Sequence, residues 1–167
     1  SVVKWNLESL AYEGRVAGAA GELLGWLGDD RLISLDGNAL VVWRAEDGES
    51  VRRIEGPPAT FVGIPSPDGK HVAALAKKDV ALIDGGTGTT VRSLGIAASR
   101  QLASFSKDGS QLAVGTSVAR KSVVSVFEIA SGQLLVTLER PALNRLLLDT
   151  GAIWLGGDDG TLERFAF

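Results

Sequence analysis

A repeat of about 40 residues limits the folds open to this chain more than any other feature of the sequence. A short apolar stretch that ends in a large residue occurs five times, and its last residues are Trp5, Trp43, Ile83, Phe127 and Phe165. Their spacings are 38, 40, 44 and 38 residues. Because self-similarity at a fixed period is the signature of repeat architectures, the 167 residues hold about four similar units.

Two polar turns stand at the same place in neighbouring units. Residues 66–70 read Ser-Pro-Asp-Gly-Lys, and residues 106–110 read Ser-Lys-Asp-Gly-Ser. Each precedes a short apolar stretch, which begins at His71 in one unit and at Gln111 in the next. The Asp-Gly pair suits a tight turn between strands, since glycine adopts a positive φ without steric cost.

The local pattern favours strands throughout. Apolar segments are short and often β-branched, and Gly, Asp and Ser interrupt them every 8 to 12 residues, which is typical of a sandwich, barrel or propeller. The best helical stretch, residues 17–27, contains Gly18, Gly21 and Gly25 and is therefore predicted as a loop followed by a strand.

A four-stranded unit of about 40 residues, repeated radially, describes the blade of a β-propeller. We therefore predict an all-β chain of four-stranded antiparallel blades, with about four blades' worth of residues in one domain or propeller fragment (1–167). The predicted blades cover 15–55, 56–95, 96–139 and 140–167. The last has only three predicted strands and would be completed by residues 1–14 or by another chain.

The turn and strand motifs resemble those of WD40-like propellers. The stretch 156–165, Gly-Gly-Asp-Asp-Gly-Thr-Leu-Glu-Arg-Phe, is similar to the WD40 turn and the strand that ends in Trp-Asp, and 66–70 is similar to turns of degenerate bacterial repeats. Trp5 and Trp43 stand at the Trp position, but no unit keeps Trp-Asp and no Gly-His pair exists. The resemblance implies a degenerate WD40-like propeller without the family's buried hydrogen-bonded tetrad.

Ring closure has three alternative explanations, because WD40-type propellers usually have seven blades. The chain could close a four-bladed ring, with Val2–Trp5 as the outer strand of the last blade. It could be an arc of a larger ring, which is favoured by the start of the chain at Ser1 without an initiator methionine. Two copies could also join into one eight-bladed ring. Open sheet edges and faces promote association, so an isolated arc is expected to find a partner.

Composition excludes several classes of function. The chain has no cysteine, a single histidine and a net charge of −3, so disulfides, Cys-ligated metals and thiol catalysis are excluded. No basic tract supports nucleic-acid binding, and no apolar run reaches the roughly 18 residues of a membrane span. We expect no cofactor, no metal and no enzymatic activity. The compartment stays open, with the cytoplasm slightly favoured.

Candidate binding residues gather in the predicted loops on one rim of the propeller, where binding groups concentrate. The loop around 116–121 is longer than its counterparts and accounts for the 44-residue spacing. The predicted partner-binding residues are Lys77, Lys78, Arg100, Arg120, Lys121, Asp158 and Asp159. Trp26 and Trp154 are predicted to pack in the core between blades.

The expected function is that of a non-catalytic protein–protein interaction scaffold, part of a larger protein. Two alternatives stay open: a propeller that binds a small molecule or metal in its channel, and a structural module whose role is to close a ring with another copy or chain.

Overall fold

The computed structural model describes residues 2–5, 8–16, 21–55, 60–76, 78–96, 101–118 and 121–167, and within them every regular element is a β-strand. The strands are β1 (Val2–Trp5), β2 (Tyr12–Val16), β3 (Glu22–Leu27), β4 (Arg31–Asp36), β5 (Ala39–Arg44), β6 (Ser50–Glu55), β7 (Thr60–Pro65), β8 (His71–Ala76), β9 (Asp79–Asp84), β10 (Thr90–Ser93), β11 (Gln101–Phe105), β12 (Gln111–Val118), β13 (Lys121–Glu128), β14 (Leu134–Pro141), β15 (Leu143–Asp149), β16 (Ala152–Gly157) and β17 (Leu162–Ala166). The all-β prediction is confirmed. In the described residues, no helix is long and apolar enough to cross a bilayer.

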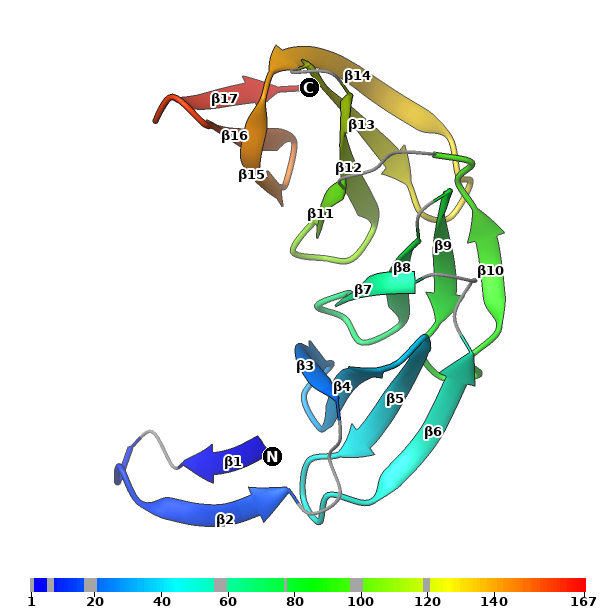
Figure 1. Cartoon of the computed structure of the whole chain (residues 1–167), viewed down its shortest axis with the longest axis vertical. Coiled ribbons are helices and arrows are strands. Elements are labelled where there is room, and N and C mark those ends of the chain that lie inside the picture. Colours follow the sequence, from blue (N-terminus) through cyan, green and yellow to red (C-terminus); the bar gives the residue numbers. More distant parts are fainter. Residues whose placement is uncertain are drawn as a thin grey trace.

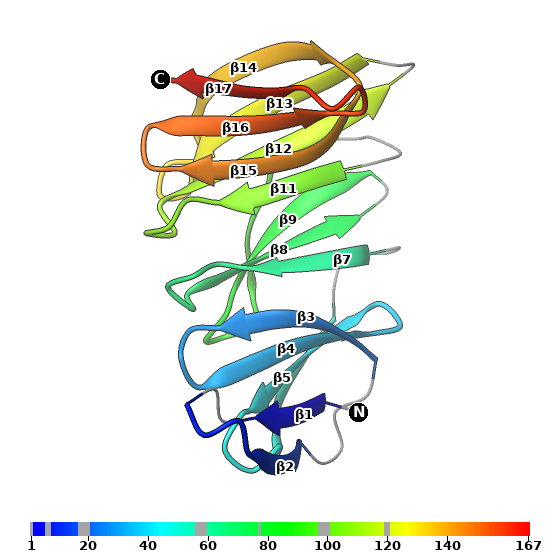
Figure 2. The ribbon, with the colours of Figure 1, turned by 90° about the vertical axis from the view of Figure 1, so that its left-hand side faces the viewer.

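The strands form five antiparallel sheets in chain order. Three have four strands (β3–β6, β7–β10 and β11–β14), one has three (β15–β17) and one has two (β1–β2). We call β3–β6, β7–β10 and β11–β14 the first, second and third sheets, β15–β17 the last sheet, and β1–β2 the N-terminal hairpin. Figure 1 shows the sheets following one another around a C-shaped arc, with β3, β7, β11 and β15 on its inner side and β6, β10 and β14 on its outer side. Figure 2 shows the same succession from the open side. The β7–β10 and β11–β14 sheets each have a neighbouring sheet packed on both faces, which is a propeller-like arrangement.

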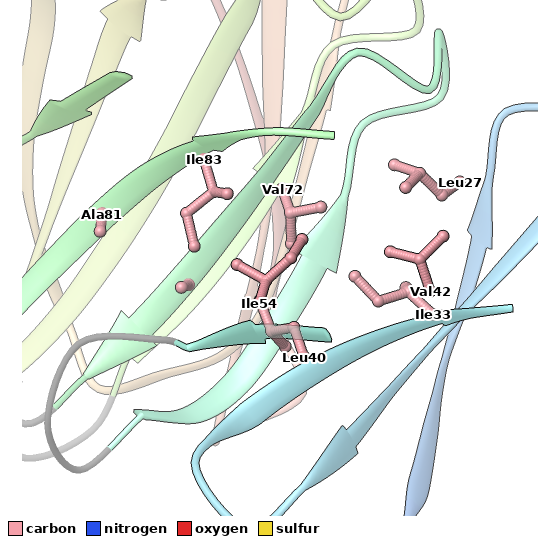
Figure 3. Packing of buried hydrophobic residues seen from close by; sticks show 9 residues of the cluster. Leu27, Ile33, Leu40, Val42, Ile54, Val72, Ala81 and Ile83 are labelled. Carbon is pink, nitrogen blue, oxygen red and sulfur yellow. The ribbon is translucent and has the colours of Figure 1, made fainter. Parts of the chain in front are cut away.

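Side chains that alternate along the strands fill the space between consecutive sheets. Leu27, Ile33 and Leu40 of the first sheet meet Val72 and Ile83 of the second (Figure 3). All five are 1% exposed or less. Two further clusters of the same kind lie between the second and third sheets and between the third and last sheets. Burying such apolar surface is the main contribution to the stability of the arc.

The two polar turns found in the sequence adopt one hydrogen-bond pattern. Ser66 Oγ donates to Asp68 Oδ1 (2.6 Å) and accepts from the His71 N–H (2.9 Å). Ser106 and Asp108 repeat the first bond at 2.7 Å, and the Gln111 N–H donates to Ser106 Oγ at 2.9 Å. These turns also touch between sheets: a Cβ added to Gly109 (φ +72°) would lie 2.7 Å from Asp68 Cγ.

The turn between the third and fourth strands rests on the outer strand of the preceding sheet. Arg52 of β6 donates from Nη1 to the carbonyl of Thr87 (3.0 Å), and a Cβ on Gly88 would meet the Ile54 side chain at 3.0 Å. In the next sheet, a Cβ on Gly132 would lie 2.5 Å from Arg92 Nε. The β3–β6 and β7–β10 sheets therefore each support a turn of the sheet that follows.

The N-terminal strands form a hairpin of their own. β1 pairs with β2, and this hairpin and the β15–β17 sheet lie at opposite ends of the arc (Figures 1 and 2). The four-bladed closure, in which Val2–Trp5 would pair with the last sheet of the same chain, is therefore not the arrangement of this structure.

Candidate functional site

The candidate site is the outward face of the last sheet, and the strand register shows why it is unusual. In each of the four larger sheets, one residue of the third strand lies three positions before the large residue that ends this strand. Its backbone pairs with an equivalent residue of the second strand. These pairs are Leu35↔Leu40, Leu75↔Val80, Gly115↔Val124 and Gly156↔Leu162. In the first three sheets, this position faces the next sheet along the arc.

The exposure of these equivalent residues differs sharply between the sheets. Leu40, Val80 and Val124 are each 0% exposed, whereas Leu162 is 71% exposed. The last sheet therefore keeps an apolar residue at the position that packs against the next sheet elsewhere in the arc, but none of the described residues covers it here.

The surroundings of Leu162 form a shallow hollow of about 610 Å³. Its lining is predominantly apolar and comes from all three strands: Arg145, Leu146, Leu147, Trp154, Gly156 and Leu162. Leu147 is 59% exposed, and its backbone pairs with that of Trp154. An exposed apolar surface of this kind is a candidate interaction site.

Arginines border the hollow. The guanidinium carbon of Arg164 lies 5.8 Å from the centre of the Trp154 ring, which is within the range of a cation–π contact. On the other face of the sheet, Arg140 lies 4.1 Å from the Phe165 ring centre and donates from Nε to Glu163 (3.0 Å). The outward face therefore combines an apolar centre with the positive charges of Arg145 and Arg164.

The outer edge of β17 is a second feature of the same site. In the four-stranded sheets, the third strand pairs with a fourth strand through one register: Trp43↔Ser50, Ile83↔Thr90 and Phe127↔Leu134, each seven residues apart and next to a bulge. The last sheet has the order β15-β16-β17, so within the described residues β17 pairs only with β16. Such an edge offers backbone N–H and C=O groups for pairing with another strand.

The predicted rim residues are placed only in part. Lys77, Arg100 and Arg120 lie outside the described residues. Lys78 lies in the β8–β9 turn and Lys121 begins β13, and both are exposed. The beginnings of β9 and β13 and the end of β16 lie at one edge of the arc (Figure 2). Lys78, Lys121, Asp158 and Asp159 stand at or next to these strand ends and therefore share that edge.

The two acidic rim residues make different hydrogen bonds. Asp159 Oδ1 accepts hydrogen bonds from the Thr161 hydroxyl (2.7 Å) and the Thr161 N–H (3.0 Å). These bonds hold the pKa of Asp159 below its usual value, with the hydroxyl bond contributing most. The Asp158 N–H donates to the carbonyl of Ala142 (3.2 Å). The structure therefore gives the Asp159 side chain a role in the turn that leads into β17, whereas the backbone of Asp158 ties this turn to the segment before β15.

Other polar motifs of the sequence have structural partners. In the glycine-rich turn after β9, the N–H groups of Gly86 and Thr87 donate to Asp84 Oδ1 at 2.9 and 2.6 Å, so these amides already have a carboxylate of the chain as their partner. His71 begins β8, half-buried, with its N–H on Ser66. Among the described residues, no group of three or more His, Asp or Glu side chains could hold a metal ion.

The structure corrects the prediction for the two tryptophans. Trp26 is 54% exposed on the inner strand β3, so its placement in the core is wrong. Trp154 lies in the hollow, half-buried, on the face that no sheet covers. The repeat placed both residues at strand positions, but burial at those positions depends on a neighbouring sheet.

Leu147 and Leu162 are functional candidates that the sequence did not reveal. The usable signal is the alignment of Leu162 with Leu40, Val80 and Val124, which shows that an apolar contact is built into every unit. That alignment could not show that the contact of the last unit is unfilled.

Comparison with known proteins identifies the fold type but no family. No protein-family model matches the chain. No curated protein matches it either. Among solved structures, the chain is similar to the computationally designed Ika4 protein (19% identity, TM-score 0.71, covering 90% of this chain and 94% of that one).

Two natural proteins share the same arrangement over about half of their length. Kuenenia stuttgartiensis hydrazine synthase matches with 16% identity and a TM-score of 0.68, covering 92% of this chain and 48% of that chain. U3-55K matches with 16% identity and a TM-score of 0.64, covering 90% and 54%. At this level of identity, the comparisons establish similarity of fold alone.

Proposed function

We propose that this chain is a WD40-like β-propeller segment that acts as a non-catalytic protein–protein interaction scaffold, and that it binds its partner through the outward face of β15–β17. The partner would present a β-sheet face with apolar side chains, because that is what the equivalent faces of the other sheets contact. Acidic groups at the edge of the partner would complement Arg145 and Arg164.

One observation supports this proposal above the others: the 71% exposure of Leu162 against 0% for Leu40 at the equivalent position. Burying one leucine side chain stabilises a complex by about 1.5–3 kcal/mol. Trp154 and Leu147 lie beside Leu162 and would be covered by the same partner. A face that was only a solvated surface would not be expected to repeat the apolar positions of the buried interfaces.

The proposal is tested by measuring protein binding to the immobilised chain, with quantitative mass spectrometry of the retained proteins and of added untagged chain. Leu162→Glu should abolish retention of the specific partner. Leu134→Glu is the matched control, since Leu134 is 50% exposed on β14, away from the hollow. Retention that survives Leu162→Glu would reject the outward face as the binding site.

The rim remains a second candidate because Lys78, Lys121, Asp158 and Asp159 stand at or next to strand ends that share one edge of the arc (Figure 2). Lys121→Glu and Asp158→Lys in the same assay would separate the two surfaces. Loss of retention in these variants, with Leu162→Glu unaffected, would move the binding site to the rim.

A further inference from the structure

The two ends of the arc carry complementary parts of one sheet, and from this we infer the occupant of the open face. We propose that two copies of this chain close one ring head to tail: the β15–β17 sheet of each copy takes the place of β1 in its partner and accepts the partner's β2 as its fourth strand. This inference rests on the proposed function and names the partner as a second copy.

The first argument is the register of the N-terminal hairpin. β1 and β2 pair at Trp5↔Tyr12, seven residues apart, with a bulge between Lys4 and Trp5. The third and fourth strands of all three complete sheets show the same spacing and the same bulge. β2 therefore has the backbone geometry of a fourth strand, which is the element that the last sheet lacks.

The second argument is that β1 and β17 are equivalent strands. Trp5 and Phe165 both stand at the repeat position that ends a third strand. If β17 replaces β1 beside β2, the shared register pairs Phe165 with Tyr12, Glu163 with Arg15, and Leu162 with Val16. The third and fourth strands of the resulting sheet would then match those of the complete sheets.

The third argument comes from the first sheet, whose outward face is built to contact a preceding sheet. Leu32, Val41 and Trp43 form an apolar cluster on this face, and each is 7% exposed or less. The β1–β2 hairpin lies on this side of the first sheet (Figures 1 and 2). In the proposed ring, Trp154 and Leu162 of one copy would pack on this cluster of the other.

The fourth argument excludes closure within one chain. Three buried clusters fix the angles between consecutive sheets, and with these angles β2 and β17 lie at opposite ends of the arc (Figure 1). Bringing them together in one chain would require the sheets to separate from one another. A second copy satisfies both ends and gives up only the β1–β2 pairing, while the buried clusters between the other sheets stay intact.

The first test is the mass of the 167-residue chain in solution, measured by sedimentation equilibrium over a concentration series. We expect a species of twice the chain mass of 17.4 kDa, whose dissociation constant rises at least about tenfold in Leu162→Glu and is unchanged in Leu134→Glu. A monomer at every concentration would overturn the second copy as the occupant. It would leave the proposed function standing if a different protein is still retained through Leu162.

The second test is cross-linking, which is clean because the natural chain has no cysteine. The double variant Arg15→Cys/Glu163→Cys should form a disulfide-linked dimer on oxidation, since its two cysteines would face each other in the proposed pairing. Glu13→Cys/Glu163→Cys, displaced along the strand, is the off-register control and should cross-link far less.

Each other outcome of the cross-linking rejects the inference. A cross-linked monomer would show that β2 pairs with β17 of the same chain. A dimer that cross-links equally in both variants, or in neither, would show that two copies meet without the proposed strand pairing. Both results are distinct from failure of the proposed function, which depends on Leu162 and not on β2.

Discussion

The second sheet and the last sheet are built from the same repeat but experience opposite surroundings. β7–β10 is covered on both faces, so Ala73, Leu75, Val80 and Leu82, which face the third sheet, are all 1% exposed or less. The equivalent positions of β15–β17 hold Trp154, Gly156, Leu162 and Arg164, and Leu162 is 71% exposed. Position within the repeat therefore determines the kind of contact a residue can make, whereas the neighbouring sheet determines whether that contact exists.

The largest expected effect tests this comparison directly with two equivalent leucines. Leu40→Ala should lower the free energy of unfolding by about 2–5 kcal/mol, because it leaves a cavity between two sheets. Leu162→Ala should change it by no more than about 0.5 kcal/mol in dilute, dissociated protein. Urea unfolding followed by circular dichroism measures both. Equal losses would mean that Leu162 is already covered in the single chain.

A second substitution tests the outward face of the first sheet, which is buried, whereas the outward face of the last sheet is exposed. Trp43 Nε1 donates to Ser34 Oγ (2.9 Å) in a buried hydrogen bond on the outward face of the first sheet. Ser34→Ala should cost about 1–3 kcal/mol, since the indole N–H loses its partner away from water. A loss near zero in the same unfolding measurement would show that water reaches this face.

Two equivalent glycine turns isolate the contact between neighbouring sheets. Gly109 and Gly151 have φ values of +72° and +66°, so alanine is strained at both. At Gly109, however, the added Cβ would meet the Asp68 carboxyl group, which Ser66 and the Lys70 N–H hold in place. The nearest atom at Gly151 is 3.7 Å away. Gly109→Ala should therefore be more destabilising by about 1 kcal/mol, and indistinguishable thermal midpoints of the two variants would contradict this.

The smallest expected effect is the titration of the turn carboxylates. The Ser106 hydroxyl, together with the N–H and hydroxyl of Ser110, lowers the pKa of Asp108 to about 2. An ordinary aspartate titrates near 3.9, so this contribution to stability is complete above that pH and is lost as the pH falls towards 2. A carboxyl-detected NMR titration should show this midpoint. Ser106→Ala should raise the Asp108 midpoint while that of Asp159, in the last sheet, stays unchanged.

The sequence predicted the strands well because their signals are local. Apolar alternation and the Asp-Gly turns placed β3 through β17 to within a few residues. Of the stretch 17–27, the part predicted as a strand is β3 (Glu22–Leu27), whereas 17–20 lie outside the described residues. The β12–β13 hairpin is longer than its counterparts, because β12 extends to Val118 and β13 begins at Lys121. This extra length accounts for the 44-residue spacing in the repeat.

The candidate site could not be predicted to the same extent, because it depends on what a face meets. Trp26 and Leu162 have the residue types of core positions, and only the order of the sheets shows that they are exposed. The sequence predicts the charged rim residues as binding residues because they stand in loops, yet the Asp159 side chain bonds within its own turn. Polar motifs of one segment can be interpreted locally, whereas an unfilled interface is a property of the whole arc.

The support that the outer strands β6 and β10 give to the next sheet influences the order in which the sheets unfold. Arg52 holds the turn at Thr87, and Arg92 lies against the turn at Gly132, so the loss of one sheet removes a support from the sheet that follows it. The coupling is between nearest neighbours, as in a linear array. The single chain is therefore expected to unfold from its two ends inward. The β7–β10 sheet, the third of the five in chain order, should be the last to exchange its amide hydrogens.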